Sequence, residues 1–372
     1  MNHAARLKTV IDILKRIEES RVPMDSTIGD LMRTRRFIGA KDRANIVERV
    51  YAIIRAQARL DWWMQRLQAP PYPRYRALLW LILGEQHKDP ESLFDGSQYG
   101  AEVLSDVGKT ILIAATGQPL DHPDMPEAVR VECPTVHEAA LRQQFGADFA
   151  KEMEAMLHGA SLDLRVNTKH ITRENAQGSL AKDGVITDLT VYSPWGLRAR
   201  SKAFLSHTKA FVKGWVEIQD EGSQLIAYVC GAKPGMQVLD FCAGGGGKTL
   251  ALAAAMQIKG RIVATDTEAS RLEKARLRFR RAGASDIVEV RPLSDEKNRK
   301  WLRRQKETFD VTLCDVPCSG SGTWRRNPDM RWRVFGPKPE ELIPVQADIL
   351  DRACKTVKKG GRLVYATCSL LP

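Results

Sequence analysis

The spacing of apolar residues changes character along the chain. In the first 115 residues, apolar side chains recur every three or four positions, which predicts helices over residues 10–20, 44–67 and 75–85. The tryptophans at 62, 63 and 80 fall within these segments, and we expect them in the core. The stretch that follows, 116–134, is rich in proline and aspartate and indicates a linker.

The middle of the chain mixes two periodicities over a short length. Residues 138–157 show an amphipathic helical pattern. After it, the sequence predicts a strand over 162–168, a helix over 174–184, and strands over 185–194 and 195–200. Such a segment is typical of a small α/β domain.

From about residue 216, short apolar runs alternate with helical patterns. Strands are predicted at 237–242, 261–266, 286–290, 310–315 and 361–368, with helices over 248–256, over 270–283 and in a stretch that ends near 361. This alternation predicts a parallel sheet covered by helices. The expected domains are a helical one (1–125), a small α/β one (126–215) and a larger α/β one (216–372).

Composition narrows the class of protein. The chain of 372 residues is 43% hydrophobic and 27% charged, which suits a folded protein with substantial cores. No apolar run approaches the roughly 20 residues that span a bilayer, and the first residues lack the apolar stretch of a signal peptide. We therefore expect a cytoplasmic monomer with no membrane partner. The cysteines are scattered without a CxxC pair, so neither disulfides nor a metal site are expected.

The net charge of +12 favours a polyanionic partner such as a nucleic acid. The excess lies after residue 150, because residues 1–150 carry 20 Lys or Arg against 20 Asp or Glu. Arginine is nevertheless dense between Arg33 and Arg76. A solvated helix surface and a nucleic-acid face explain that run equally well.

A glycine-rich turn, CAGGGGKT, follows the first strand of the larger domain. Such a turn lets a ligand approach the backbone at the start of a helix. It is a near match to a phosphate-binding GxxxxGK[ST] loop, but Cys242 stands where that loop needs glycine. Asp266 ends the next strand, where a carboxylate can accept both hydroxyls of a ribose. An NTPase has no use for this acid and a dinucleotide enzyme would need GxGxxG, so S-adenosylmethionine (SAM) is the favoured ligand.

Two cysteines follow predicted strands: Cys318 the fourth and Cys368 the fifth. Because the carboxyl ends of parallel strands line the ligand crevice of an open sheet, these cysteines are placed to meet over a substrate. Most cysteines are inert core residues, and we keep that interpretation for Cys314 and Cys354. The turn sequences PCSG and TCS favour a chemical role for the other pair.

These segments carry a family resemblance. VLDFCAGGGGKT, DVPCSGSGTWRRNPDMRWR and YATCSLLP resemble motifs of the RNA (cytosine-5)-methyltransferases of the RsmB/NSUN (Fmu/Sun) family. The helical N-terminus resembles the NusB-like RNA-binding domain of the bacterial rRNA enzymes, and LRVNT lies where their small RRM-like domain begins. The resemblance implies a Rossmann-like SAM-dependent methyltransferase sheet. The paired cysteine motifs point to RNA, because DNA cytosine methylases carry only the first.

The resemblance also implies roles for residues. Cys368 would add to C6 of the target cytosine so that C5 can take the methyl group of SAM, and Cys318 would assist release of the product. Asp315 would hydrogen-bond the cytosine edge. The implied SAM contacts are Cys242, Ala243, Gly244, Gly245, Gly246, Gly247, Lys248, Asp266, Asp295 and Asp315, and the implied RNA contacts are Arg325, Arg326, Arg331 and Arg333.

Two features depart from the family pattern. The family loop reads APGGKT, whereas Gly245 here occupies the place of the proline. The family sheet has two further strands after the TCS motif, whereas this sequence stops at Pro372. We therefore expect a truncated sheet with an open edge, Cys368 on a frayed tail, and lower stability and activity than in an extended chain.

The sequence favours a SAM-dependent RNA (cytosine-5)-methyltransferase that acts on small-subunit rRNA, with tRNA as an alternative substrate. A second hypothesis is a catalytically incomplete RNA-binding protein that acts in ribosome assembly. A P-loop-like NTPase is the third.

Overall fold

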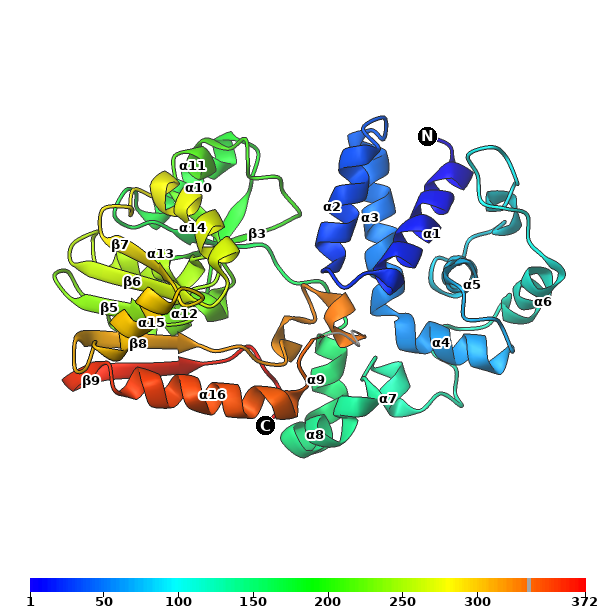
Figure 1. The fold of residues 1–372 in the computed structure, drawn as a ribbon. Coiled ribbons are helices and arrows are strands. Elements are labelled where there is room, and N and C mark those ends of the chain that lie inside the picture. The colour runs from blue at the N-terminus through cyan, green and yellow to red at the C-terminus, as the bar shows by residue number, and fades with distance from the viewer. Residues whose placement is uncertain (333–335) are drawn as a thin grey trace. The chain divides into compact units, whose positions relative to one another are not determined.

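The computed structural model describes residues 1–332 and 336–372, which fall into two compact units (Figure 1). Unit 1 comprises Met1–Gly159, Ser319–Gly336 and Cys368–Pro372, and unit 2 comprises Ala160–Cys318 and Pro337–Thr367. The chain therefore passes between the units directly after Cys318 and directly before Cys368. Of the predicted site residues, Arg333 lies outside the described residues.

Unit 1 is helical. Its helices are α1 (His3–Glu19), α2 (Met24–Thr34), α3 (Ala40–Arg55), α4 (Gln57–Arg66), α5 (Pro73–Leu79), α6 (Asp106–Ala115), α7 (Glu127–Arg130), α8 (Thr135–Phe145) and α9 (Phe149–Ala155). Short helical turns are η1 (Trp80–Gly84), η2 (Glu91–Leu93), η3 (Gly146–Asp148), η4 (Ser321–Thr323) and η5 (Pro328–Arg331). The apolar faces of α1 to α6 meet in one core, which includes Leu7, Ile13 and Ile53.

The helices predicted near the N-terminus are confirmed, with one break that the periodicity did not show. The segment predicted as one helix over 44–67 is divided between α3 and α4, because Ala56 leaves the helical conformation at φ −105° and ψ 18°. Trp63 is 2% exposed in the core, and the partly buried Trp62 and Trp80 pack against the same core. Their prediction as core residues therefore holds.

A second, smaller core in unit 1 is built around Trp324, which is 1% exposed. We call it the Trp324 core, and it consists of Ala128, Val131, Cys133, Leu141, Phe149, Met153, Met156 and Trp324, with Met330, Leu370 and Leu371 packed against it. Residues that follow each of the two predicted catalytic cysteines thus pack among α7, α8 and α9. The expectation of a frayed tail needs correction, because residues 370 and 371 are part of a packed cluster.

Unit 2 begins with a small antiparallel sheet. Its strands are β1 (Asp163–Val166), β2 (Thr187–Leu189), β3 (Gly196–Ala199) and β4 (Val216–Ile218), in the order β2-β3-β1-β4. The helices α10 (Arg173–Lys182) and α11 (Lys209–Val212) accompany it. Leu164, Val166, Leu180 and Leu197 form its core.

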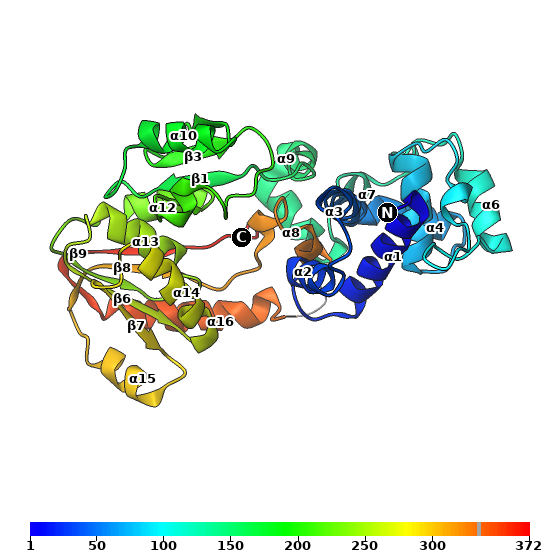
Figure 2. The same ribbon diagram turned by 90° about the horizontal axis from the view of Figure 1, so that it is seen from above.

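The rest of unit 2 is a parallel sheet with helices on both faces. Its strands are β5 (Gln237–Asp240), β6 (Arg261–Asp266), β7 (Val288–Pro292), β8 (Phe309–Asp315) and β9 (Val357–Ala366), in the order β7-β6-β5-β8-β9. The helices are α12 (Glu221–Val229), α13 (Gly247–Ala255), α14 (Ala269–Arg281), α15 (Glu296–Arg303) and α16 (Pro339–Cys354). Figure 2 shows α12, α13 and α14 on one face and α15 and α16 on the other, which agrees with the two apolar clusters of the sheet.

This strand order creates a switch point. From β5 the chain moves outward through β6 to β7, then returns to β8 on the other side of β5 and continues to β9. In open parallel sheets, ligands bind outside the carboxyl ends of the strands where the order reverses. The loops that follow β5 and β8 therefore meet at the expected position of a ligand crevice.

The compact units differ from the predicted division at 125/126 and 215/216. Helices α8 and α9 belong to the helical unit, and β4 pairs with β1 although it lies beyond residue 215. Among the described residues, no helix is both long and apolar enough to cross a membrane. Within the same residues, no group of three His, Cys, Asp or Glu side chains is placed to hold a metal ion.

The substitution Trp324→Ala should destabilise the Trp324 core. Removal of a fully buried tryptophan side chain costs about 3–5 kcal/mol. Because a chain of two units lacks a single well-defined unfolding free energy, native-state hydrogen exchange is the appropriate measurement. We expect faster exchange at amides of α8 and α9 and unchanged exchange in β5 and β6.

The control is Phe37→Ala, which removes a ring that is 78% exposed in the same unit. Unaltered protection of α8 and α9 would contradict the anchoring role of Trp324.

Candidate active site

The glycine loop joins β5 to α13 and passes twice through left-handed conformations. Gly244 has φ +54° and Gly246 has φ +74°. A Cβ atom at Gly246 would lie 2.4 Å from the Phe279 ring, so both the backbone angle and the packing require glycine there. The first amides of α13 have no acceptor within their own helix. A loop of this shape at a helix N-terminus suits an anionic ligand group.

Asp266 ends β6 and fixes the glycine loop from the side. Its side chain is 8% exposed, and its Oδ2 accepts a hydrogen bond from the Gly244 amide at 2.8 Å. Its Oδ1 accepts from the Glu268 amide at 2.9 Å. Each carboxylate oxygen can accept two hydrogen bonds. Asp266 can therefore hold the loop and still accept hydroxyl groups of a ligand.

Asp240 lies beneath the loop at the end of β5 and is fully buried. Its Oδ2 accepts from the Thr249 hydroxyl of α13 at 2.7 Å, while its Oδ1 has no hydrogen-bond partner among the described residues. Burial raises the pKa of the Asp240 carboxyl to about 7. We did not single out Asp240 as a site residue from the sequence, although an acid at the end of the apolar run VLD was a usable signal.

Lys248 and Asp315 form an ion pair at the switch point. Lys248 lies in the first turn of α13 and Asp315 ends β8, and the distance from Nζ to Oδ2 is 2.7 Å. Their side chains are 13% and 32% exposed, so the pair is accessible. The structure thus brings together the predicted loop lysine and the predicted acid of the cysteine motif, which are far apart in the sequence.

Asp295 and Cys242, two further residues predicted to contact the cofactor, differ in burial. Asp295 is exposed and caps α15, where its Oδ1 accepts from the Lys297 amide at 2.8 Å. Cys242 is half-buried, and burial raises the pKa of its thiol. Burial also raises the pKa of the Cys314 thiol to about 12, in agreement with an inert core residue. The same prediction is wrong for Cys354, which is exposed on α16.

The segment that carries Cys318 is held to the sheet in unit 2. The Val316 amide donates to the Ala366 carbonyl at 3.0 Å, which extends the pairing of β8 with β9 by one residue. The Gln346 side chain donates to the Pro317 carbonyl at 2.8 Å. Cys318 itself is half-buried.

The segment that carries Cys368 is hydrogen-bonded within unit 1. The Gly322 amide donates to the Cys368 carbonyl at 2.8 Å. The hydroxyls of Ser319 and Ser369 lie 2.8 Å apart, and the Leu370 amide donates to the Ser321 hydroxyl at 2.6 Å. Cys368 is exposed. The segments that follow β8 and β9 are therefore hydrogen-bonded to each other at two places. One place lies before the cysteines, in unit 2, and the other lies after them, in unit 1.

The four predicted RNA-binding arginines differ in their surroundings. Arg331 is 5% exposed and donates to the carbonyls of Glu132 at 3.1 Å and Met156 at 2.8 Å, and burial lowers the pKa of its guanidinium to about 10. Arg325 is exposed but donates to the carbonyls of residues 158 and 159. Arg326 is exposed. Arg333 lies outside the described residues.

One residue that the sequence analysis did not single out contacts the loop. Arg278 of α14 donates from Nη1 to the Gly245 carbonyl at 2.5 Å. Nothing in the sequence distinguishes Arg278 from the other arginines of α14, because any of them could be a solvated surface residue.

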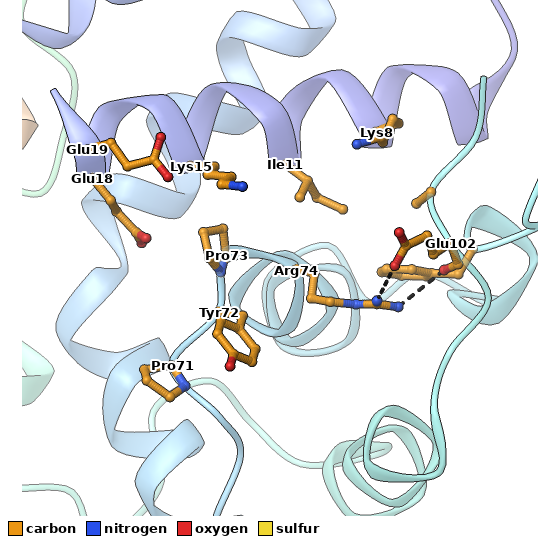
Figure 3. Close-up of a pocket in the computed structure, with 12 residues that line it drawn as sticks. Lys8, Ile11, Lys15, Glu18, Glu19, Pro71, Tyr72, Pro73, Arg74 and Glu102 are labelled. Carbon is orange, nitrogen blue, oxygen red and sulfur yellow. Dashed lines mark hydrogen bonds and ion pairs between the residues drawn. The ribbon is translucent and has the colours of Figure 1, made fainter. Parts of the chain in front are cut away.

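A hollow of about 450 Å³ lies in unit 1 beside α1, and none of the predicted site residues line it (Figure 3). Its lining includes Lys15 and Glu19 of α1 and Tyr72 beside α5. Arg74 crosses it to an ion pair with Glu102 at 3.0 Å. With both charge signs on its walls, the hollow indicates no particular ligand, and we assign it no role in the chemistry.

Comparison with protein families gives two matches. A family model described as 16S rRNA methyltransferase RsmB/F matches residues 227–372. A second, described as Methyltr_RsmF/B-like, ferredoxin-like domain, matches residues 138–203. The first range contains the glycine loop and both strand-end cysteines.

Individual proteins extend the similarity. The probable ribosomal RNA small subunit methyltransferase B of Synechocystis sp. is 35% identical over 213 residues, which cover 57% of this chain and 47% of that protein. The ribosomal RNA small subunit methyltransferase B of Pectobacterium atrosepticum is 29% identical over 352 residues, which cover 91% of this chain and 81% of that protein. The crystal structure of PH0851 has the same fold, with a TM-score of 0.77 and 23% identity over 99% of this chain and 86% of that one.

The substitution Asp240→Asn should alter how stability depends on pH. The folded carboxyl has a pKa of about 7, whereas an unfolded aspartate titrates near about 3.9. The unfolded chain gives up its proton first, so Asp240 lowers stability as the pH rises from about 4 to about 7. Asparagine cannot ionise. The midpoint of the thermal transition of unit 2 in the variant minus that in the parent should therefore increase over this range and then level off.

The matched control is Asp310→Asn. A hydrogen bond from Lys358 and one from the Gln237 amide lower the pKa of the Asp310 carboxyl. Its stabilising effect is present above the unfolded pKa and is lost only as the pH falls below about 4. Its midpoint difference should stay constant between about pH 5 and about pH 8. The same flat profile for Asp240→Asn would contradict a neutral buried carboxyl beneath the loop.

Proposed function

The chain belongs to the RsmB/F family of ribosomal RNA methyltransferases, and on this premise we propose that it methylates C5 of a cytosine in small-subunit rRNA with SAM as the methyl donor. One observation supports the proposal most strongly. The segments that carry Cys318 and Cys368 leave neighbouring parallel strands and are hydrogen-bonded to each other on both sides of the cysteines. The proposed mechanism uses two thiols at the same base, one to add to C6 and one to assist release, and this arrangement suits that use.

The residues around the glycine loop fit SAM. The amides at the start of α13 suit a carboxylate, and the buried acid Asp266 keeps acceptor capacity for ribose hydroxyls. We propose that the loop from Cys242 to Lys248, together with Asp266 and Asp315, holds the cofactor. Asp295 follows β7 and is proposed as the residue nearest the adenine. When bound, SAM supplies an electrophilic methyl group.

Cys368 is the proposed nucleophile. C5 of cytosine is a poor nucleophile until a group adds to C6, and a thiolate can form that bond. The sulfur–C6 bond moves electron density to C5, which can then take the methyl group. The exposed position of Cys368 gives a flipped base access to the thiol. The buried Cys314, whose thiol has a pKa of about 12, is unsuited to this role.

Cys318 is the proposed residue for release. After methylation, C5 must lose its proton and the C6–sulfur bond must break, which restores the aromatic ring and frees Cys368. The position of Cys318 is set on both sides, because Pro317 before it and Ser319 after it are both hydrogen-bonded. We propose that Cys318 assists this elimination.

Asp315 is proposed to orient the base. A carboxylate at the end of β8 can accept a hydrogen bond from the exocyclic amine of cytosine. Lys248 holds this carboxylate at 2.7 Å and so restricts its orientation. Among the predicted RNA contacts we retain Arg326 and Arg325 for the backbone near the target. Arg331 is left out because its guanidinium is buried against backbone carbonyls.

The test is a covalent-trapping experiment with unmethylated small-subunit rRNA and SAM on a denaturing gel. Cys318→Ala should accumulate a protein–RNA band, because the adduct forms but is released slowly. Turnover should fall by about 10²-fold or more, as expected when assistance to proton transfer is lost. Cys318→Ala combined with Cys368→Ala should give no band.

The matched control is Cys354→Ala, which removes an exposed thiol of unit 2 outside the proposed site and should behave as the parent. A band that persists in the double variant would mean that another residue is the nucleophile. SAM and RNA binding without any band or methylation would favour the alternative of an RNA-binding protein with an incomplete catalytic site. Transfer RNA in place of rRNA tests the substrate class.

A further inference from the structure

One guanidinium links the small sheet to the glycine loop. Arg278 of α14 donates from Nη1 to the Gly245 carbonyl at 2.5 Å. Its Nε and Nη2 donate to Oε2 of Glu217 at 3.2 Å and 3.1 Å. Glu217 lies on β4 of the small sheet and is 3% exposed. The same side chain therefore contacts an anchored carboxylate on one side and the loop on the other.

The loop needs an external restraint. Glycine loses more conformational freedom on folding than any other residue, and residues 244 to 247 are all glycine. The bond from Arg278 fixes the carbonyl of Gly245, which lies between the two left-handed glycines. A Cβ atom at Gly245 would lie 3.4 Å from Nη1 of Arg278, so the guanidinium lies directly against this residue.

Arg278 is itself held in place. Glu217 also pairs with Arg281 through its other oxygen, and the Arg281 guanidinium lies over the Phe211 ring at 3.9 Å. Arg165, opposite Glu217 in the register of β1 and β4, is 2% exposed, and burial lowers the pKa of its guanidinium to about 10. A buried carboxylate that accepts from two guanidiniums and lies opposite a third arginine in the strand register is strongly constrained in orientation. The rigid donor fork of Arg278 transmits that constraint to the Gly245 carbonyl.

We propose that Arg278, held by Glu217, is a positioning residue for the cofactor loop, and that the small sheet sets the affinity of this loop for SAM through the pair. The inference rests on the proposed function for the identity of the ligand. Arg278 acts on the loop backbone and is no catalytic residue. Its loss should therefore weaken SAM binding and leave the chemical steps at the cysteines unchanged once SAM is saturating.

The test measures SAM affinity directly, by calorimetric titration in the absence of RNA. Arg278→Met should raise the dissociation constant about tenfold, the effect of one lost charge-assisted hydrogen bond. With saturating SAM, turnover on rRNA should match the parent, so the change appears in KM for SAM and not in kcat. Arg278→Lys should lie between the two, because an ammonium can reach the carbonyl or the carboxylate but lacks the fork that binds both.

Two further variants separate positioning from general stabilisation. Arg276→Met removes an exposed arginine of the same helix, paired with Glu273 at 2.9 Å, and should leave SAM affinity unchanged. Glu217→Gln should weaken SAM binding by about threefold, as one weakened polar contact would. Combined with Arg278→Met it should add nothing further, because Glu217 acts through Arg278. Additive losses in the double variant would overturn the proposed link.

Affinities are compared at a temperature where hydrogen exchange in β5 and β6 is the same in all variants, so that unfolding does not contribute. Equal SAM affinity in Arg278→Met and the parent would overturn this inference and leave the proposed function standing. A loss of kcat with unchanged affinity would also overturn it. If the parent chain binds no SAM, both the proposed function and this inference fail.

Discussion

The parallel pairing of β8 with β9 is the constraint on which the candidate active site depends. It aligns Asp315 with Ala366, so the two strands end together and the chain leaves both at the same edge of the sheet. Cys318 and Cys368 follow within three residues, and a serine pair bonds the two segments again beyond them. A shift of this register by one residue would turn every side chain of β9 to the other face. The proposed chemistry, which uses both thiols at one base, would then be lost.

The helical unit packs around the segments that follow the two cysteines. Trp324 and Leu370 follow the two cysteines in the sequence and pack together among α7, α8 and α9. Arg331 reinforces the same region by donating to the carbonyls of Glu132 and Met156. Its interior anchors the residues that follow each of the two cysteines in the sequence.

Order in the glycine loop comes from its neighbours. Asp266 holds the Gly244 amide from β6, and Arg278 holds the Gly245 carbonyl from α14. Beneath the loop, Asp240 accepts from the first turn of α13. Burial raises the pKa of this carboxyl to about 7, so it carries a buried charge only as the pH rises through that value. A flexible sequence is thus fixed by polar groups on rigid elements, which leaves the backbone open to a ligand.

Local signals in the sequence were sufficient for the five strands of the parallel sheet, the glycine loop and the placement of both cysteines, because each is encoded by adjacent residues and by the common direction of parallel strands. In the small sheet they missed β4, and the strand predicted over 185–194 is confined to β2. They did not reveal the break at Ala56, the membership of residues 319–336 in the helical unit, or the partners of Arg278 and Arg331. Those arginines bond to groups 61 and 199 residues away. Periodicity states which face of an element is buried, but the group that a long polar side chain meets is decided only when distant segments pack against it.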